Sequence, residues 1–210
     1  MRIALLTFDG FDELGTFVAL GLLNRLAAHG WKAQIACPGS HVTSLNGVTV
    51  EAQQSLEFAG EADAVVFGHS LYSRAIADNG ALLDRLQLDP VRQLFAAQCG
   101  GSLLMARLGL LGDSAACADS AMRPWLIEAV VRVEDAAFHA RGSVATAAGG
   151  LASQYLAAWL MVRRLGFDAA AGALHGAAPV GEQAGYVLRL LDAVRPFVSA
   201  AKTGPGATAA

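Results

Sequence analysis

Short, continuous apolar runs alternate along this chain with longer segments in which apolar residues recur at helical spacing. A strand that is apolar on both faces must be covered on both faces, which is typical of parallel sheets packed between helices. The alternation therefore predicts an α/β protein with a doubly wound, mostly parallel sheet and helices on both sides. The predicted strands are Ile3–Phe8, Ala33–Cys37, Ala64–Phe67, Leu94–Ala97 and Val144–Ala147.

Three longer segments have the apolar spacing of helices, and one has the signature of a hairpin. The helical segments are Phe11–His29, Leu151–Leu165 and Gly181–Val198. The first aligns Phe11, Leu14, Phe17, Val18, Leu22 and Leu26, and the last aligns Val187, Leu190, Leu191, Val194 and Phe197. Asn46-Gly47 within Thr43–Val50 predicts a hairpin with a type I′ turn.

The composition is that of a folded chain with a large core. Hydrophobic residues make up 54% of the 210 residues and charged residues 16%, the opposite of a disordered chain. We expect one domain over residues 1–198 and a disordered tail over 199–210, where small residues dominate.

Charge and cysteine content narrow the class of partner. The net charge of −3 predicts no binding to nucleic acid or to an anionic membrane surface. Three cysteines do not make a disulfide framework, and the first residues lack the pattern of a secretory signal. These features predict a cytoplasmic protein.

The segment around Cys99 carries the strongest functional signal, because an apolar strand runs directly into a helix at this residue. Ala97 and Gly101 flank it at the spacing of a nucleophile elbow, a sharp turn that requires small neighbours. The N-terminus of the following helix is expected to lower the thiol pKa and to supply oxyanion donors. The alternative is a small buried side chain, which we expect for Cys37 and Cys117.

Four blocks of the sequence carry a further signal, namely Phe8–Leu14, Asn46-Gly47, Ala97–Gly101 with Leu108–Leu111, and Val144–Gly150. Together they resemble the ThiJ/PfpI superfamily of DJ-1-like proteins, which has a class I glutamine amidotransferase-like fold. The resemblance covers nearly all of the chain up to residue 198 and implies a flavodoxin-like three-layer sandwich. The Gly-Leu-Leu after the elbow helix is most similar to bacterial isonitrile hydratases.

The resemblance implies a homodimer in which the elbow cysteine is a nucleophile beside a carboxylate of the first helix. That carboxylate would fall at Gly15, where a glycine costs a helix about 0.5–1 kcal/mol relative to alanine. Either the acid has been lost, or another group replaces it, or Glu13 supplies it. Gly15 is kept as a candidate substrate-binding position.

Asp119 and His69 are further candidates. Asp119 stands where many relatives have a histidine, and it either caps a helix or acts as a general acid or base if burial raises its pKa. His69 follows a central strand at the edge where α/β sheets bind ligands, and it either pairs with Cys99 or is an exposed loop residue. The N–H groups of Gly68 and Gly100 are predicted oxyanion donors.

These residues predict thiol chemistry on a small electrophilic molecule, without a metal or another cofactor. The resemblance implies an isonitrile hydratase-like lyase in which Cys99 forms a thioimidate with the substrate. The alternatives are a glyoxalase or deglycase acting on methylglyoxal-type aldehydes, and a non-catalytic cysteine sensor or chaperone. The absence of an acid at Gly15 favours the last of these.

Overall fold

A seven-stranded sheet in the order β10-β11-β7-β6-β1-β2-β5 forms the centre of the protein, whose computed structural model describes residues 1–198. Every pair of neighbours is parallel except β10 with β11. The predicted tail lies outside the described residues. The strands are β1 (Arg2–Leu6), β2 (Lys32–Cys37), β5 (Gln54–Ser55), β6 (Ala64–Phe67), β7 (Leu94–Gln98), β10 (Phe138–Arg141) and β11 (Val144–Ala147).

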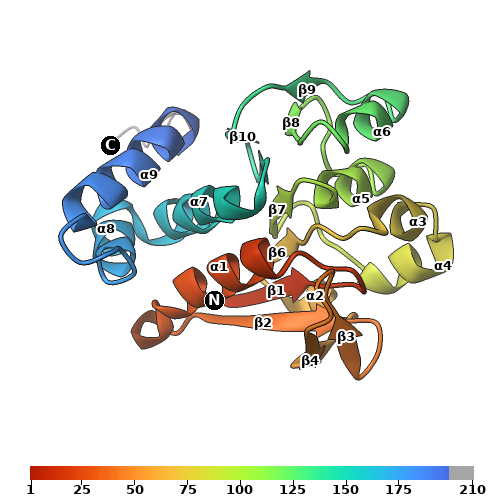
Figure 1. The fold of residues 1–210 in the computed structure, drawn as a ribbon, viewed down its shortest axis with the longest axis horizontal. Coiled ribbons are helices and arrows are strands. Elements are labelled where there is room, and N and C mark those ends of the chain that lie inside the picture. Colours follow the sequence, from red (N-terminus) through yellow and green to blue (C-terminus); the bar gives the residue numbers. More distant parts are fainter. Residues whose placement is uncertain (199–210) are drawn as a thin grey trace, which may run out of the picture.

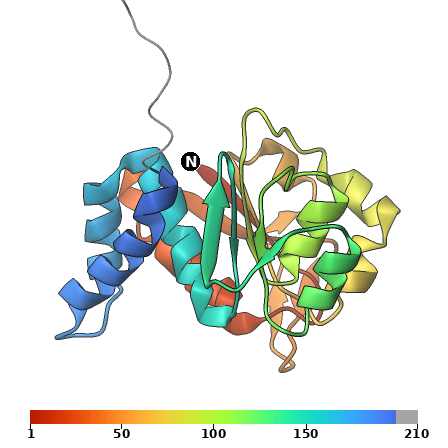
Figure 2. The ribbon, with the colours of Figure 1, turned by 90° about the horizontal axis from the view of Figure 1, so that it is seen from above.

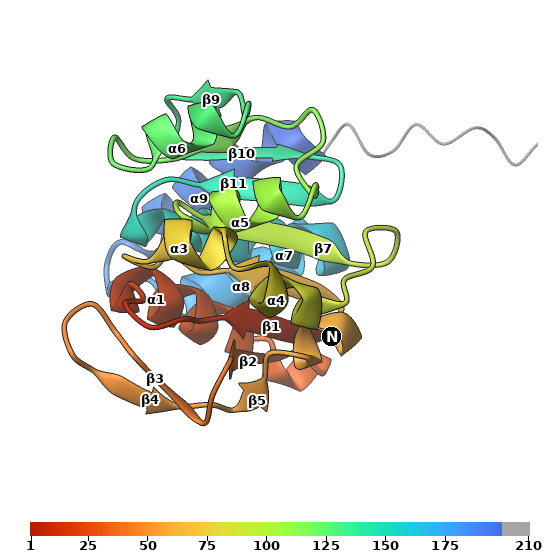
Figure 3. The ribbon, with the colours of Figure 1, turned by 90° about the vertical axis from the view of Figure 1, so that its right-hand side faces the viewer.

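Helices cover both faces of this sheet (Figures 1 and 2), which confirms the predicted three-layer α/β fold. One face carries α1 (Glu13–Asn24), α7 (Ser153–Leu165), α8 (Phe167–His175) and α9 (Gln183–Val198). The other carries α2 (Phe58–Glu61), α3 (Ser73–Ala77), α4 (Gly80–Leu83), α5 (Gly101–Arg107) and α6 (Arg123–Glu128). Figure 3 views the sheet from the side of α3 and α5, with α7 and α8 behind it.

The continuous apolar runs arise because successive strand residues enter two different cores. In β1, Ile3 and Leu5 pack with α1 and α7, whereas Ala4 and Leu6 pack with the helices of the opposite face. All four side chains are at most 2% exposed. The predicted strands are therefore confirmed, although β1 ends at Leu6 rather than at Phe8.

The first helix differs from its predicted stripe. Asp12 caps the helix, so α1 begins at Glu13, and its buried face is made by Gly15, Thr16, Ala19, Leu22 and Leu23. Leu14 and Phe17 are 51% and 38% exposed, so their predicted place in the core is wrong. Small residues on the buried face allow α1 to lie close to the sheet and to α7. The helix α8 was not predicted, because its alanine-rich sequence has few large apolar residues.

The predicted hairpin is formed by β3 (His41–Thr43) and β4 (Thr49–Glu51), but its turn is not type I′. Gly47 has a φ of +85° whereas Asn46 is not in the left-handed region, and type I′ requires both. The N–H of Gly47 donates to the Ser44 carbonyl at 3.1 Å, which closes a turn followed by a left-handed glycine. A second short pair joins β8 (Ala116–Cys117) to β9 (Val133–Glu134).

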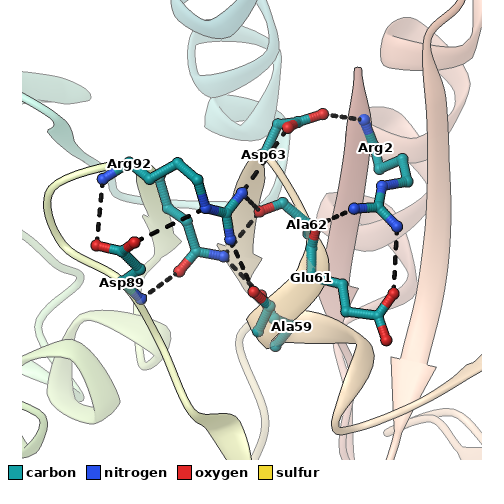
Figure 4. A network of polar contacts seen from close by, with 9 residues as sticks. Arg2, Ala59, Glu61, Ala62, Asp63, Asp89 and Arg92 are labelled. Carbon is teal, nitrogen blue, oxygen red and sulfur yellow. Dashed lines mark hydrogen bonds and ion pairs between the residues drawn. The ribbon is translucent and has the colours of Figure 1, made fainter.

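A polar network closes the amino-terminal edge of the sheet (Figure 4). The elbow follows the opposite, carboxyl end of β7. The Gln93 carboxamide, 1% exposed, donates to the carbonyls of Ala59 and Ala62 at 2.6 and 2.8 Å. The Arg92 guanidinium donates to the carbonyls of Ala62 and Gly60. These bonds satisfy the carbonyls that α2 leaves free at its C-terminus.

Within residues 1–198, none of the helices combines the length and the apolar character that crossing a membrane would require.

Candidate active site

Cys99 lies at a strained turn between β7 and α5. Its φ of +44° is in the left-handed region, which non-glycine residues rarely adopt. Its N–H donates to the Ala147 carbonyl of β11 at 2.8 Å, and the residue is only 3% exposed. The predicted nucleophile elbow is thereby confirmed as a strand-turn-helix geometry.

The two glycines after Cys99 are required by close approach to neighbouring segments. A Cβ on Gly101 would lie 2.2 Å from the Phe67 carbonyl oxygen. A Cβ on Gly100 would lie 2.3 Å from Ser73 Oγ and 2.7 Å from His69 Nδ1. The elbow is thus packed tightly against the segment that joins β6 to α3.

The imidazole of His69 is part of the elbow. Its Nδ1 accepts a hydrogen bond from the Gly100 N–H at 3.2 Å, and the residue is half-buried, so the alternative of an exposed loop histidine is wrong. In the neutral ring, Nε2 then carries the proton and is a donor. The Gly68 N–H donates to the Leu6 carbonyl at 3.1 Å, so its predicted use as an oxyanion donor is wrong. The Gly100 N–H is also engaged, by His69.

Asp119 brings a carboxylate to the thiol. It forms a hydrogen bond with the Cys99 side chain, and its Oδ1 accepts from the N–H groups of Ala121 and Met122 at 3.0 and 2.9 Å. Burial alone would raise the pKa of Asp119, but these hydrogen bonds and the nearby His69 together hold it below its ordinary value. The capping alternative is therefore confirmed, the condition of a raised pKa is not met, and Asp119 is an ionised acceptor at neutral pH.

The thiol itself is protonated at neutral pH. Burial raises the pKa of Cys99 to about 12, and the hydrogen bond and charge of the Asp119 carboxylate add to this effect. Hydrogen bonds from the backbone at Asp119 and Gly100 oppose it without reversing it. The expected lowering of the pKa by the helix N-terminus is wrong, because α5 has only seven residues and the sulfur is desolvated.

The position expected to carry a helix carboxylate is filled from the strand. A Cβ on Gly15 would lie 1.8 to 2.2 Å from the carboxamide of Gln98, the last residue of β7. The Gln98 Nε2 donates to Asp12 Oδ2 at 2.8 Å. Neither Gln98 nor Asp12 was a sequence candidate; a glutamine ending an otherwise apolar strand next to Cys99 was the available signal.

Glu13 faces the hairpin. Its carboxylate accepts hydrogen bonds from Ser44 Oγ and from Asn46 Nδ2, the latter at 2.9 Å. The Ser44 bond is the main reason why the pKa of Glu13 is lowered. These contacts join α1 to the β3–β4 hairpin, and Glu13 is not among the groups that act on the Cys99 thiol.

The other cysteines are buried and have partners. Cys37 Sγ donates to the Gly39 carbonyl at 3.3 Å, and the Cys117 thiol bonds to Thr146. Burial raises the pKa of Cys117 to about 11. Among residues 1–198, no three His, Cys, Asp or Glu side chains lie close enough to hold a metal ion.

A cavity of about 420 Å³ opens beside Asp119. Small side chains line most of it, including Ala118, Ala137 and Ala148. Ala148 follows the residue that binds the Cys99 N–H, so the cavity adjoins the elbow on the β11 side. This space is large enough for the side group of a small substrate.

The chain belongs to the DJ-1/PfpI family, whose sequence model matches residues 1–161. Solved structures with the same fold include a THiJ/PfpI family protein from Pseudomonas syringae, at 17% identity and a TM-score of 0.76, with 94% of this chain and 87% of that chain covered. Schizosaccharomyces pombe DJ-1 has 14% identity and a TM-score of 0.74 over 85% of this chain and all of that one.

A structure titled as an AraC family transcriptional regulator from Pseudomonas putida is also similar, at 21% identity and a TM-score of 0.68, covering 84% and 99% of the two chains. At such identities the likeness concerns the fold. A search among curated proteins gives no match.

Proposed function

We propose that the protein is a cysteine-dependent enzyme that adds water to a small electrophilic carbon, in the manner of an isonitrile hydratase. The observation that carries this proposal is the placement of the Asp119 carboxylate beside the buried Cys99 thiol at the left-handed turn, where each group shifts the pKa of the other. A thiol with a high pKa loses its proton only as the C–S bond forms, when the sulfur becomes far more acidic, and Asp119 is the carboxylate that lies beside it.

Isonitrile chemistry suits one carboxylate beside one thiol, because the terminal carbon gains both the sulfur and the thiol proton. Cys99 Sγ bonds to this carbon while Asp119 takes the proton and passes it to the same carbon, which gives a thioimidate. Water then adds to that carbon. The C–S bond breaks and an N-substituted formamide leaves. The thiol proton stays on its carbon, one proton of the water goes to the nitrogen, and the other goes to sulfur. In this scheme the substrate nitrogen accepts a hydrogen bond from the His69 Nε2–H, the ring nitrogen that does not bond to Gly100.

The alternatives fit the site less well. A glyoxalase must move a proton between two carbons, and Gln98 fills the position where the resemblance implies a second acid. A peroxide sensor reacts as the thiolate, which is scarce when the pKa is about 12. A homodimer acting on a small molecule in the cytoplasm remains part of the proposal, and sedimentation would measure the oligomeric state.

The test is turnover of an aryl isonitrile and, in parallel, of methylglyoxal by the purified protein. We expect formamide from the isonitrile, and no detectable product from the Cys99→Ala variant. Cys117→Ala is the matched control, because this second buried cysteine has no role in the scheme, and it should keep its activity. Turnover of methylglyoxal alone would contradict the proposal, as would isonitrile turnover that survives loss of Cys99.

A further inference from the structure

Gln98 links the residue before the nucleophile to the N-terminus of α1. It is 2% exposed, and its Nε2 donates to Asp12 Oδ2 at 2.8 Å. Asp12 also accepts from the backbone N–H groups of Leu14 and Gly15, at 3.1 and 3.2 Å. A carboxylate can only accept hydrogen bonds, so Asp12 fixes the orientation of the Gln98 carboxamide, whose NH2 group must face it.

The junction leaves no spare volume. The Gln98 carboxamide lies where a side chain on Gly15 would begin, 1.8 Å from the Cβ position. On the other side, a Cβ on Gly150 would be 2.9 Å from Asp12 Oδ2. Gly15 weakens α1 as a helical residue, but its missing side chain provides the space that the Gln98 carboxamide occupies.

A left-handed cysteine persists only where its neighbours fix the backbone on both sides. After the turn, Gly100 and Gly101 are packed against the segment that follows β6. At the turn, the Cys99 N–H is held by Ala147. Before the turn, the side-chain contact that ties the end of β7 to α1 is the bond between Gln98 and Asp12.

We propose that Gln98 is a positioning residue for Cys99. Its bond to Asp12 anchors the end of β7 on α1 and so holds the thiol buried against Asp119, and Gly15 supplies the room. The inference rests on the proposed role of Cys99 as the nucleophile, but its test reads the thiol directly and needs no substrate.

The test compares Gln98, the last residue of β7, with Gln93, the residue immediately before this strand. Gln98→Leu removes the bond to Asp12 at similar volume, whereas Gln93→Leu removes equally buried bonds at the far end of the strand. The iodoacetamide alkylation rate of Cys99 is followed against pH by mass spectrometry of its peptide, with circular dichroism to verify folding. Thermal unfolding measures the loss of stability in each variant.

We expect Gln98→Leu to expose the thiol and to shift its alkylation profile down by about one pH unit or more, with roughly tenfold faster reaction at pH 8. Gln93→Leu should lower stability and leave the profile in place. The inference is overturned if the two variants have the same profile, because Gln98 would then be merely structural.

Gly15→Ala tests the same contact from the helix. Since alanine favours a helix, this change should stabilise α1 and leave the thiol unaffected if the carboxamide has no role. We expect instead that it displaces the carboxamide and speeds alkylation, and that it adds no further change in the Gln98→Ala background. Additive effects of the two substitutions would overturn the inference. If the wild-type protein turns over no isonitrile, the alkylation result still decides this point.

Discussion

At the scale of single residues, the site depends on a thiol that is protected rather than activated at rest. Cys99 combines a left-handed backbone, near-complete burial and a carboxylate neighbour. Each of the last two favours the neutral thiol. In the proposed reaction, the thiol therefore gives its proton to Asp119 only as the bond to the substrate carbon forms.

Asp119→Asn separates the two roles of this carboxylate. Asparagine still caps the turn, so stability should change little. Loss of the negative charge and of the hydrogen bond should lower the pKa of Cys99 and speed its alkylation at pH 9 several-fold. Turnover should fall by about 10²-fold or more, because the proton acceptor is gone. The control is Asp113→Asn, which replaces an exposed acid and should change neither the alkylation rate nor the turnover rate. If Asp119→Asn lowered the alkylation rate together with the turnover rate, the role of Asp119 as proton acceptor would be refuted.

At the scale of elements, the C-terminal end of α6 places a valine in a backbone conformation that valine disfavours. The N–H groups of Val130 and Val131 donate to the carbonyls of Ile127 and Leu126, both at 2.9 Å, which is the pattern of a Schellman motif. Val130 occupies the left-handed position with a φ of +61° and is 93% exposed. Glycine is the residue that this position favours.

Val130→Gly should stabilise the protein by about 1 kcal/mol, because a left-handed non-glycine residue costs about 1–2 kcal/mol and the extra flexibility of glycine in the unfolded chain offsets part of the gain. Thermal or urea unfolding measures it. The control is Val180→Gly, an equally exposed valine whose φ is not in the left-handed region, which should lose stability slightly. Equal effects of the two substitutions would disprove the strain.

The sequence predicted the central strands well, because a strand that is buried on both faces has a continuous apolar run, which is visible in the local sequence. The prediction failed where burial of a side chain depends on which other element of the fold packs against it. Leu14 and Phe17 follow the helical period but stay partly exposed, since the buried face includes the small residues Gly15 and Ala19. In the site, Cys99 was identifiable from its flanking residues, whereas the pKa of its thiol depends on burial that only the fold creates.

At the scale of the whole molecule, the layer of α7, α8 and α9 explains an apolar run within a helix. Every residue of Leu156–Val162 is buried. The sheet covers one side of α7, and the helices α8 and α9 cover its other side (Figure 1). These last two helices lie beyond the segment matched by the family. They are required to keep the outer face of α7 from water.

Leu190→Ala and Leu188→Ala measure this contribution within one helix. Leu190 is fully buried in the core shared with α7, so its truncation should cost about 2–5 kcal/mol of unfolding free energy. Leu188 is 60% exposed, and its truncation should change stability by no more than about 0.5 kcal/mol. Chemical denaturation gives both values. Similar losses at the two positions would contradict the packing of α9 described above.

The bond between Cys99 and Ala147 also sets an order of events during synthesis. A ribosome makes Cys99 about fifty residues before the strand that holds its N–H, and Asp119 emerges in between. Until β11 joins β7, the nascent chain carries Cys99 as an ordinary cysteine, with a pKa of about 8.5 and full access to water. Electrophiles should therefore damage newly made protein far faster than the finished molecule, and the same thiol would pass from exposed to sheltered only as the last third of the chain folds.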